Sequence, residues 1–497
     1  MRIALERDGK TPLYQQIEAY LRQAILAGSL PPETRLPASR KLASDLGVNR
    51  ITVEKAYAGL EADGLVFSQV GSGTYVLPPP GPPQARAAPG APWPLWQQEL
   101  QARQPVASAP APEILLAEAG HPDPIDFSSG SGDAQRFPVE ELRRVIQAIL
   151  RRDGIAALEY GERGCSERGY TPLRSTIAQV LASQGLPAGP ENILITSGSQ
   201  QALALAAQAL LQPGEVVLVE SPTYSGALEL FRLLALRIAG VPVDDNGLQI
   251  EKLEALLQQQ HPKLIYTIPN FHNPTGACLN ASRRRQLVEL AGRYNLPILE
   301  DDFVGDLRYE GRTQPALKAL DPDGRVVYTS TFSKMLMPGL RVGFLVASGP
   351  VYERLVAGKR VSDLATSSLT QRALEAYVTV GRYQAHLRRS CQVYRKRRDA
   401  MLHAIKRYLS SGVQFSPPQG GLFVWLRLPG ALNAEDLLPL ACEQGVAFAP
   451  GGRFFPADAA VNAGYLRLNF AVQTPERIQA GMQRLGKALR RLKAGAA

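Results

Sequence analysis

The spacing of apolar residues in the first 77 positions predicts three helices followed by a hairpin. A first amphipathic helix ends near Gly28, and a second covers much of LPASRKLASDLG and ends at Gly47. Asn49 is placed to cap a third helix. The apolar positions of that helix share one face by i, i+3, i+4, i+7 spacing: Val53, Ala56, Tyr57 and Leu60. Two β-rich runs then flank a Gly-Ser-Gly turn in LVFSQVGSGTYV, which predicts a hairpin.

The pattern changes abruptly at Pro78. From there to about Pro112 the chain is rich in Pro and Ala, a composition that forms an extended, semi-rigid spacer. We therefore expect a small domain over residues 1–77, a linker over 78–115 and a large domain over 116–497.

The large domain alternates β-like runs with helical patterns. The runs include ENILITSGSQ, EVVLVESPTY, KLIYTIPNFHNPTG, LPILEDDF and RVVYTSTFSK. Strands interleaved with helices predict an α/β fold with a mainly parallel sheet covered on both faces. Functional side chains of such folds follow the carboxyl ends of the strands. Four polar clusters fall there: residues 197–201, 270–276, 300–302 and 331–334.

Composition narrows the class of protein. No apolar run approaches the roughly 20 residues that would cross a bilayer, and the charged N-terminus lacks a signal-peptide pattern. We expect a cytoplasmic protein that does not bind a membrane. The four cysteines contain no CxxC pair, so neither a disulfide framework nor a bound metal is expected.

The net charge of +10 is unevenly distributed. Residues 1–77 contain nine Lys or Arg against eight Asp or Glu, so the excess lies further along the chain. A dense basic run, RYQAHLRRSCQVYRKRRDAM, occupies residues 382–401, and its apolar residues recur at helical spacing. This run is either a solvated helix face or a surface that contacts the DNA backbone.

Three helices and a hairpin form a winged helix-turn-helix, whose third helix enters the major groove while the hairpin approaches the backbone or the minor groove. Arg50 is expected to contact a guanine edge or a phosphate, and Arg40 a phosphate. The other expected DNA-binding residues are Asn49, Thr52, Lys55, Ser72 and Gly73. The segment from PLYQQIEAYL to EADGL, then GSGTYV, resembles the GntR-type winged helix. Glu54 departs from it, because some members carry a basic residue there.

The stretch TSTFSKMLMPGLRVGF contains a candidate covalent anchor, Lys334. A lysine forms a Schiff base with an aldehyde, and desolvation makes it a better nucleophile. Pyridoxal 5′-phosphate is such an aldehyde. Its phosphate requires oriented donors, which the start of the GSQQALALA helix and three residues near the lysine offer. Those three residues are Thr331, Ser333 and Arg341.

Two further residues match the needs of this cofactor. The pyridine nitrogen requires a carboxylate, and Asp301 follows the apolar run LPIL. The ring benefits from an aromatic neighbour, and Tyr224 in SPTY is suited to stack on it. We therefore expect Lys334, Asp301 and Tyr224 to carry the chemistry of the site.

The joint order of these motifs resembles fold type I aminotransferases across roughly residues 126–492. That resemblance implies that Lys334 holds the cofactor, that Asn273 bonds its ring hydroxyl, and that Arg467 clamps the α-carboxylate of an amino acid. It also implies a set of phosphate-binding residues: Gly198, Ser199, Gln200, Thr331, Ser333 and Arg341. Phe303 and Val304 stand where relatives usually place a tyrosine, so one hydrogen-bond donor to the cofactor ring is lost.

A GntR-type head, a Pro-rich linker and an aminotransferase-like domain together resemble the MocR family of transcriptional regulators over the whole chain. The resemblance implies a pyridoxal-phosphate-dependent, DNA-binding regulator, a head-to-tail homodimer that senses the cofactor, an amine or an amino acid through an aldimine at Lys334. The alternative is an active aminotransferase with an appended DNA-binding domain, with weak turnover. The missing tyrosine favours sensing, whereas the presence of Arg467 favours catalysis.

Overall fold

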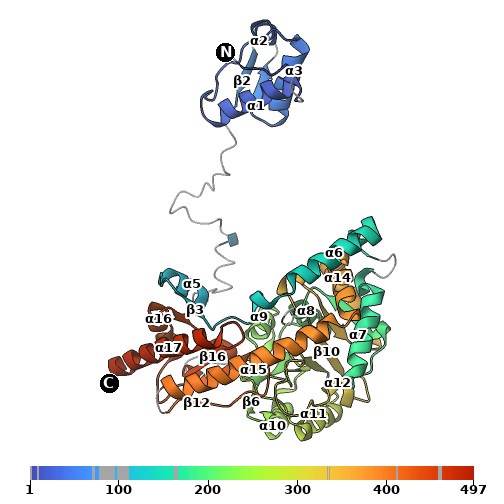
Figure 1. Cartoon of the computed structure of the whole chain (residues 1–497). Helices are drawn as coiled ribbons and strands as arrows, with labels where there is room; N and C mark the ends of the chain where they lie inside the picture. Colours follow the sequence, from blue (N-terminus) through green and yellow to red (C-terminus); the bar gives the residue numbers. More distant parts are fainter. Residues whose placement is uncertain are drawn as a thin grey trace. The chain divides into compact units, whose positions relative to one another are not determined.

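The chain divides into two compact units, Met1–Ala107 and Ser108–Ala497, which are described separately (Figure 1). The computed structural model describes residues 3–7, 11–69, 73–77, 94, 96–97, 111–161, 166–332, 334, 336–409, 412–456 and 462–496. Within these ranges, no helix is both long and apolar enough to cross a membrane.

The first unit is a winged helix-turn-helix, as the sequence predicts. Its elements are α1 (Leu13–Leu26), α2 (Ser39–Leu46), α3 (Arg50–Ala62), β1 (Val66–Gln69) and β2 (Gly73–Val76). The two strands pair antiparallel, with Val66 opposite Val76. Gly47 ends α2 in the left-handed conformation, with φ +63°, and the Asn49 side chain caps α3 by accepting a hydrogen bond from Ile51 N at 3.0 Å. The turn of the wing, which includes Ser72, lies outside the described residues.

An eight-stranded sheet forms the centre of the second unit, in the order β4-β11-β10-β9-β8-β5-β6-β7. The pairs from β10 through β9, β8 and β5 to β6 are parallel, whereas β11, β4 and β7 are joined antiparallel. The predicted, mainly parallel sheet is therefore confirmed. The strand bounds are β4 (Ile193–Thr196), β5 (Val216–Ser221), β6 (Arg237–Asp244), β7 (Gly247–Leu248), β8 (Leu264–Thr267), β9 (Ile298–Asp301), β10 (Val326–Thr331) and β11 (Gly343–Val346).

Helices cover both faces of this sheet because successive strand residues point to opposite sides. Leu218, Ile265 and Ile298 belong to one buried cluster with α10 (Ile250–Gln260) and α11 (Ala281–Arg293). Val217, Tyr266 and Leu299 face the other side and join the larger core with α8 and α9. The bounds of the other helices around the sheet are α6 (Val139–Asp153), α7 (Thr171–Ser183), α8 (Ser199–Leu210), α9 (Ser225–Leu233), α12 (Leu317–Leu320), α13 (Pro350–Asp363) and α14 (Ser368–Thr379).

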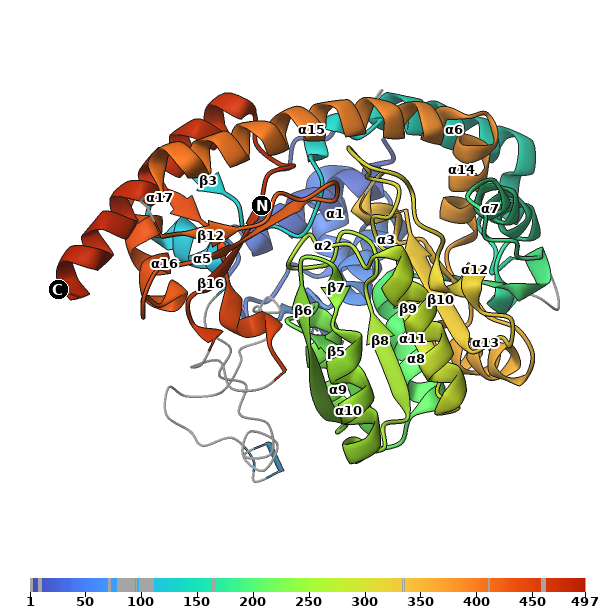
Figure 2. The ribbon, with the colours of Figure 1, turned by 90° about the horizontal axis from the view of Figure 1, so that it is seen from below.

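The C-terminal part adds a second, smaller sheet and three helices. The sheet order is β12-β13-β16-β15, and β3 pairs with β14 beside it. The long helix α15 packs against α17 along the outside of the unit (Figure 2). The bounds are β3 (Ile125–Asp126), β12 (Gln414–Phe415), β13 (Phe423–Arg427), β14 (Val446–Ala447), β15 (Ala449–Pro450), β16 (Tyr465–Asn469), α15 (Arg382–Tyr408), α16 (Ala434–Glu443) and α17 (Pro475–Ala496).

The second unit also includes a short helix that the sequence pattern did not indicate. Helix α5 (Pro112–Glu118) begins inside the stretch 78–115 that we expected to be a linker. Pro112 fits the first helical position, and the side chain of Leu116 is buried, so packing against the large unit stabilises this turn of helix.

Candidate functional site

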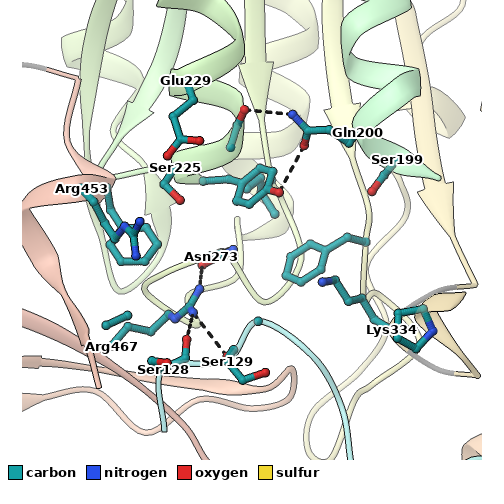
Figure 3. A pocket seen from close by; sticks show the side chains of 18 of the residues that line it. Ser128, Ser129, Ser199, Gln200, Ser225, Glu229, Asn273, Lys334, Arg453 and Arg467 are labelled. Atoms are coloured by element: carbon teal, nitrogen blue, oxygen red, sulfur yellow. Dashed lines mark hydrogen bonds between the residues drawn. The ribbon is translucent and has the colours of Figure 1, made fainter. Parts of the chain in front are cut away.

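A cavity of about 600 Å³ opens where the parallel strands end (Figure 3). Because the carboxyl ends of parallel strands meet at one edge, side chains from distant parts of the sequence gather there. Eight of the expected cofactor- and substrate-binding residues line this cavity: Ser199, Gln200, Tyr224, Asn273, Asp301, Lys334, Arg341 and Arg467.

Lys334 follows β10 and enters the cavity from the side of Ser199 (Figure 3). A Cβ added to Gly130 would lie 3.9 Å from its Nζ, so the loop after β3 passes close to the amine. Burial, followed by the positive charges of Arg467 and Arg341, lowers the pKa of Lys334 to about 8. The neutral, nucleophilic amine is therefore within reach at neutral pH.

Asp301 is the last residue of β9, and one of its two carboxylate oxygens accepts no hydrogen bond from a described residue. Its Oδ2 accepts a hydrogen bond from Tyr266 Oη at 2.9 Å, whereas its buried Oδ1 has no hydrogen-bond partner among the described residues. Burial raises the pKa of Asp301 to about 7, against the effect of the Tyr266 hydrogen bond. A protonated ring nitrogen opposite Oδ1 would satisfy that oxygen and stabilise the carboxylate.

Arg341 lies against the N-terminus of α8. Its Nη2 donates to Ser197 O at 2.9 Å, and a Cβ on Gly198 would lie 2.4 Å from the same nitrogen. Gly198 has φ +98°, which favours glycine, and it leads into the free N–H groups of the first turn of α8. A guanidinium beside a helix N-terminus is suited to bind a phosphate.

Hydrogen bonds to α13 hold the turn that precedes α8 in place. Asp363, at the end of α13, accepts hydrogen bonds from Ser197 Oγ at 3.0 Å and from Gln201 Nε2 at 2.8 Å. The fully buried Lys359 forms an ion pair with the other oxygen of Asp363. The sequence gave no signal for this pair, because both residues lie about 160 positions away from the turn that they support.

Three other residues expected to bind phosphate behave differently. Gln200 bridges α8 and α9, since it accepts from Tyr224 Oη at 3.2 Å and donates to Gly226 O at 3.0 Å. Thr331 does not line this cavity, and its hydroxyl donates to Val342 O at 3.1 Å. Ser333 lies outside the described residues.

Arg467, on β16, is held on the opposite side of the cavity from Lys334. Its Nη1 donates to Asn273 Oδ1 at 2.9 Å, and its Nη2 donates to Ser128 O at 2.6 Å. Its guanidinium also lies over the rings of Phe423 and Phe454, 4.1 and 5.0 Å from their centroids. These contacts fix the side chain, and its burial lowers the pKa of Arg467.

The far end of the cavity contains charged residues that the sequence analysis did not identify. Arg453, Glu229 and Ser225 lie on the side of the cavity away from Lys334 (Figure 3). Ser128 and Ser129 line the floor. No local motif marks these residues, because their role depends on which loops the fold brings to the cavity.

Phe303 lines the cavity where relatives usually have a tyrosine hydroxyl. Its ring stacks on Phe423 with centroids 6.5 Å apart, so the side chain belongs partly to the apolar core. Val304 is buried and does not line the cavity.

The residues expected to contact DNA lie on the surface of the first unit. Arg50 is half exposed, and its Nε donates to Glu54 Oε1 at 2.6 Å. Lys55 lies over the ring of Tyr14, 5.9 Å from the centroid, and is thereby directed toward α1. Arg40 and Asn49 are exposed, and Thr52 is partly buried. Gly73 begins β2 with φ +124°, next to the side chain of Arg35.

Comparison with known families agrees with both units. The model of aminotransferase class I and II matches residues 122–485, and that of bacterial regulatory proteins of the gntR family matches residues 13–76. The probable rhizopine catabolism regulatory protein MocR of Rhizobium meliloti is 31% identical over 100% of this chain and 97% of its own length. An uncharacterised HTH-type transcriptional regulator of Bacillus subtilis, YdfD, is 31% identical over 97% of both chains.

A solved structure gives the same answer for the large unit. The α-aminoadipate aminotransferase of Thermus thermophilus, crystallised with N-(5′-phosphopyridoxyl)-L-leucine, superposes with a TM-score of 0.73 at 36% identity. The match covers 80% of this chain and 99% of that protein.

The fold and the cavity define an aminotransferase-like α/β unit, and a winged helix-turn-helix precedes it in the chain. The chain belongs to the aminotransferase class I and II family and, within it, to the MocR family of transcriptional regulators with a GntR-type DNA-binding domain. The regulator relatives span nearly the whole chain, which the aminotransferase structure does not.

Pyridoxal 5′-phosphate is the cofactor that this family implies, and the donor set of the cavity fits it. The unused Oδ1 of Asp301 suits its ring nitrogen, the amine of Lys334 suits its aldehyde, and Arg341 at the start of α8 suits its phosphate. When bound, the cofactor supplies a carbonyl that condenses with amines and a ring that accepts electrons.

Proposed function

We propose that this regulator senses an amino acid at the Lys334 cavity and passes the signal to its DNA-binding heads. The observation that carries the proposal is that Lys334 and Arg467 line one cavity in the same chain as a winged helix-turn-helix. An amine is read at Lys334 and a carboxylate at Arg467, so the expected effector contains both groups.

Each residue of the cavity has a proposed task in this function. Asp301 holds the ring nitrogen, Arg341 and the first turn of α8 hold the phosphate, and Tyr224 covers the ring. Asn273 links the two halves of the cavity, because its Oδ1 accepts from Arg467 and its amide nitrogen remains for the cofactor. A carboxylate of the effector that binds Arg467 would therefore change the hydrogen bond between Arg467 and Asn273.

The switch requires that the effector bind two arrangements of the large unit with different affinity. The cofactor aldehyde would condense with one amine at a time, so an effector amine bound there would leave the amine of Lys334 free. The effector's carboxylate at the same time pairs with Arg467, which otherwise donates to the carbonyl of Ser128. The loop that contains Ser128 and Gly130 accepts a hydrogen bond from Arg467 and passes close to the amine of Lys334, so we infer that this loop carries the change.

We propose that the functional form is a homodimer, and a head-to-tail arrangement would place two heads on one operator. Supporting this, a run of exposed apolar side chains follows α6: Ile155, Leu158 and Tyr160 are 76%, 66% and 73% exposed. Apolar groups gathered on a surface in this way mark sites of association.

The proposal is tested by measuring DNA binding and the visible absorbance of bound cofactor in the same samples. A binding duplex is first selected from a random-sequence pool with the full chain. Amino acids are then added one at a time, and an effector is expected to change both the absorbance and the DNA affinity, the latter by roughly 5- to 150-fold. The Arg467→Gln variant should bind the cofactor and the duplex but lose the response.

The second candidate function is transamination, which the joint presence of Lys334, Asp301 and Arg467 in one cavity favours. Phe303 and Val304 weigh against transamination, because neither side chain has a hydroxyl that could donate a hydrogen bond to the cofactor ring. Rapid amino-group transfer to a keto acid, with DNA affinity indifferent to every amino acid, would replace the sensing proposal by this one.

A further inference from the structure

Most of the excess positive charge of the chain lies on one helix. Helix α15 contains nine Lys or Arg and one acidic residue, Asp399, while the whole chain has a net charge of +10. The DNA-binding head is nearly neutral, with nine basic and eight acidic residues in positions 1–77. The charge that would favour a polyanion is therefore concentrated outside the head.

Three arginines of α15 have structural tasks. Arg397 is buried and pairs with Asp133 at 2.8 Å. Arg398, also buried, pairs with Glu310 and Asp399, each at 2.7 Å, and Arg395 reaches Glu310 at 3.4 Å. The two acidic side chains beside this part of the helix, Asp399 and Glu310, are therefore both paired with these arginines.

The six remaining cations form what we call the basic face of α15: Arg382, Arg388, Arg389, Lys396, Lys406 and Arg407. All are exposed, and none has an ion pair or hydrogen bond with another described residue. Arg407 lies over the ring of the adjacent Tyr408, 5.3 Å from its centroid.

The spacing of these cations places them on a single side of the helix. Arg382, Arg389 and Lys396 follow one another at intervals of seven, while the opposite side of α15 packs into the core. The buried positions of that opposite side include Tyr383, Ser390, Tyr394 and Met401.

Exposure to water alone does not explain why one face of a helix carries charges of a single sign. Solvated helices usually alternate charge sign along a face, whereas α15 has nine cations and a single acidic residue. The basic face spans a helix of 27 residues, a length of roughly 40 Å. Helix α15 itself runs along the outside of the large unit (Figure 2).

We propose that the basic face of α15 binds the phosphate backbone of the DNA that the winged helix-turn-helix head holds. Double-stranded DNA presents about one negative charge per 1.7 Å of axis, so a straight row of cations of this length meets several phosphates. This inference rests on DNA binding by the head, which belongs to the same chain as the large unit. The contact is independent of base sequence and adds affinity, while the head reads the operator.

The test compares two triple variants of equal charge change in the full chain with bound cofactor. The test variant replaces Arg389, Lys396 and Arg407 by Gln. The matched control replaces Arg237, Lys252 and Lys263 by Gln; these are also exposed and without an ion pair to a described residue, and they lie on β6, on α10 and before β8. Affinity for the selected duplex is measured between about 50 and 200 mM salt.

The test variant is expected to bind at least about tenfold more weakly, with a salt slope shallower by up to about 2.7 per chain, and the control is expected to match the wild type. Hydroxyl-radical footprinting should show backbone protection in the wild type that only the test variant loses. Equal losses in both variants would mean that overall charge, not this face, attracts DNA, and would overturn the inference, as would no loss in either.

The Arg50→Ala variant separates this inference from the function on which it rests. Lost binding in Arg50→Ala together with an unaffected α15 variant rejects the basic face alone. Unchanged binding in Arg50→Ala rejects DNA binding through the recognition helix itself. Visible absorbance of the cofactor and circular dichroism must be unchanged in both triple variants, which shows that the fold is intact.

Discussion

Lys334 and Asp301 are both held away from water, and burial shifts each of them toward its neutral form. The pKa of the amine falls to about 8 and that of the carboxyl rises to about 7. In the cofactor-free chain at neutral pH the amine is therefore still mostly protonated and the carboxyl only partly ionised, and a protonated ring nitrogen bound beside Asp301 would favour the carboxylate. Pairing of the Asp301 carboxylate with the ring nitrogen would therefore stabilise the cavity that contains the cofactor over the empty one.

The lowered pKa of Lys334 predicts a specific pH dependence. The neutral amine is the nucleophile, so in cofactor-free protein the rate of covalent attachment of pyridoxal 5′-phosphate should rise with pH and level off above about 8. An ordinary lysine would continue to gain rate up to its pKa of about 10.4. Attachment is measured by borohydride trapping and by the mass of the peptide that contains Lys334.

Lys334→Ala is the control for this experiment. It should lose attachment at that peptide and keep DNA binding, because the head folds around its own core of Ile17, Leu21, Val53 and Leu60. A rate that climbs steadily past pH 10 would show that the amine is not desolvated.

The elements of the structure explain how side chains far apart in sequence hold the phosphate site. Helix α13 ends at Asp363, and this carboxylate fixes the turn that begins α8. Lys359 keeps the partly exposed carboxylate of Asp363 charged, since its ion pair, together with the hydrogen bonds from Gln201 and Ser197, lowers the pKa of Asp363 against the effect of burial.

We therefore predict that Asp363→Asn weakens phosphate binding selectively. The variant should bind pyridoxal 5′-phosphate several-fold to tenfold more weakly, while its affinity for pyridoxal, which lacks the phosphate, changes little. Both affinities are measured by absorbance titration. Equal weakening for the two ligands would indicate that the substitution disturbs the fold in general, and would contradict a specific role of Asp363 in positioning the turn before α8.

The recognition helix α3 contains an internal restraint on its first arginine. Glu54 accepts a hydrogen bond from Arg50 and also receives one from Ser39 at 3.3 Å, which ties α3 to α2. Arg50→Ala is expected to reduce operator affinity by roughly 1–3 kcal/mol and to relax the preference at one base pair.

Glu54→Gln is expected to act in the opposite direction. Removal of the negative charge frees Arg50 and reduces repulsion of phosphates, so affinity should increase for operator and unrelated DNA alike. Gel-shift titration on both duplexes measures this change. A gain on the operator alone would mean that Glu54 contributes to base selection.

At the scale of the whole molecule, the proposed association of two chains would bring two heads to one operator. Ile155→Glu combined with Leu158→Glu is expected to shift the proposed dimer toward monomers, because two buried charges would replace apolar contacts. Leu233→Glu is a matched control, since Leu233 is 69% exposed on another helix, α9. Sedimentation equilibrium measures the shift, and a dimer that survives the double substitution would place the contact elsewhere.

The sequence alone determined the class of both units, because local patterns carry that information. Helical spacing and the cap at Asn49 indicate the winged helix, and strands followed by polar clusters indicate a parallel sheet with its site at one edge. The sequence also predicted that Lys334, Asp301 and Arg467 belong to one site, since each lies in a motif of fixed order, and all three line the same cavity.

Only the tertiary structure decided which side chains meet. Tyr266 bonds Asp301, Asp363 supports the turn before α8, and Arg453 and Glu229 reach the far end of the cavity. It also directed the hydroxyl of Thr331 to the carbonyl of Val342, and it left six cations along one face of α15 without an ion pair to any residue that the structure describes. These relations depend on which loops and helices pack together, and packing joins positions that no local sequence pattern connects.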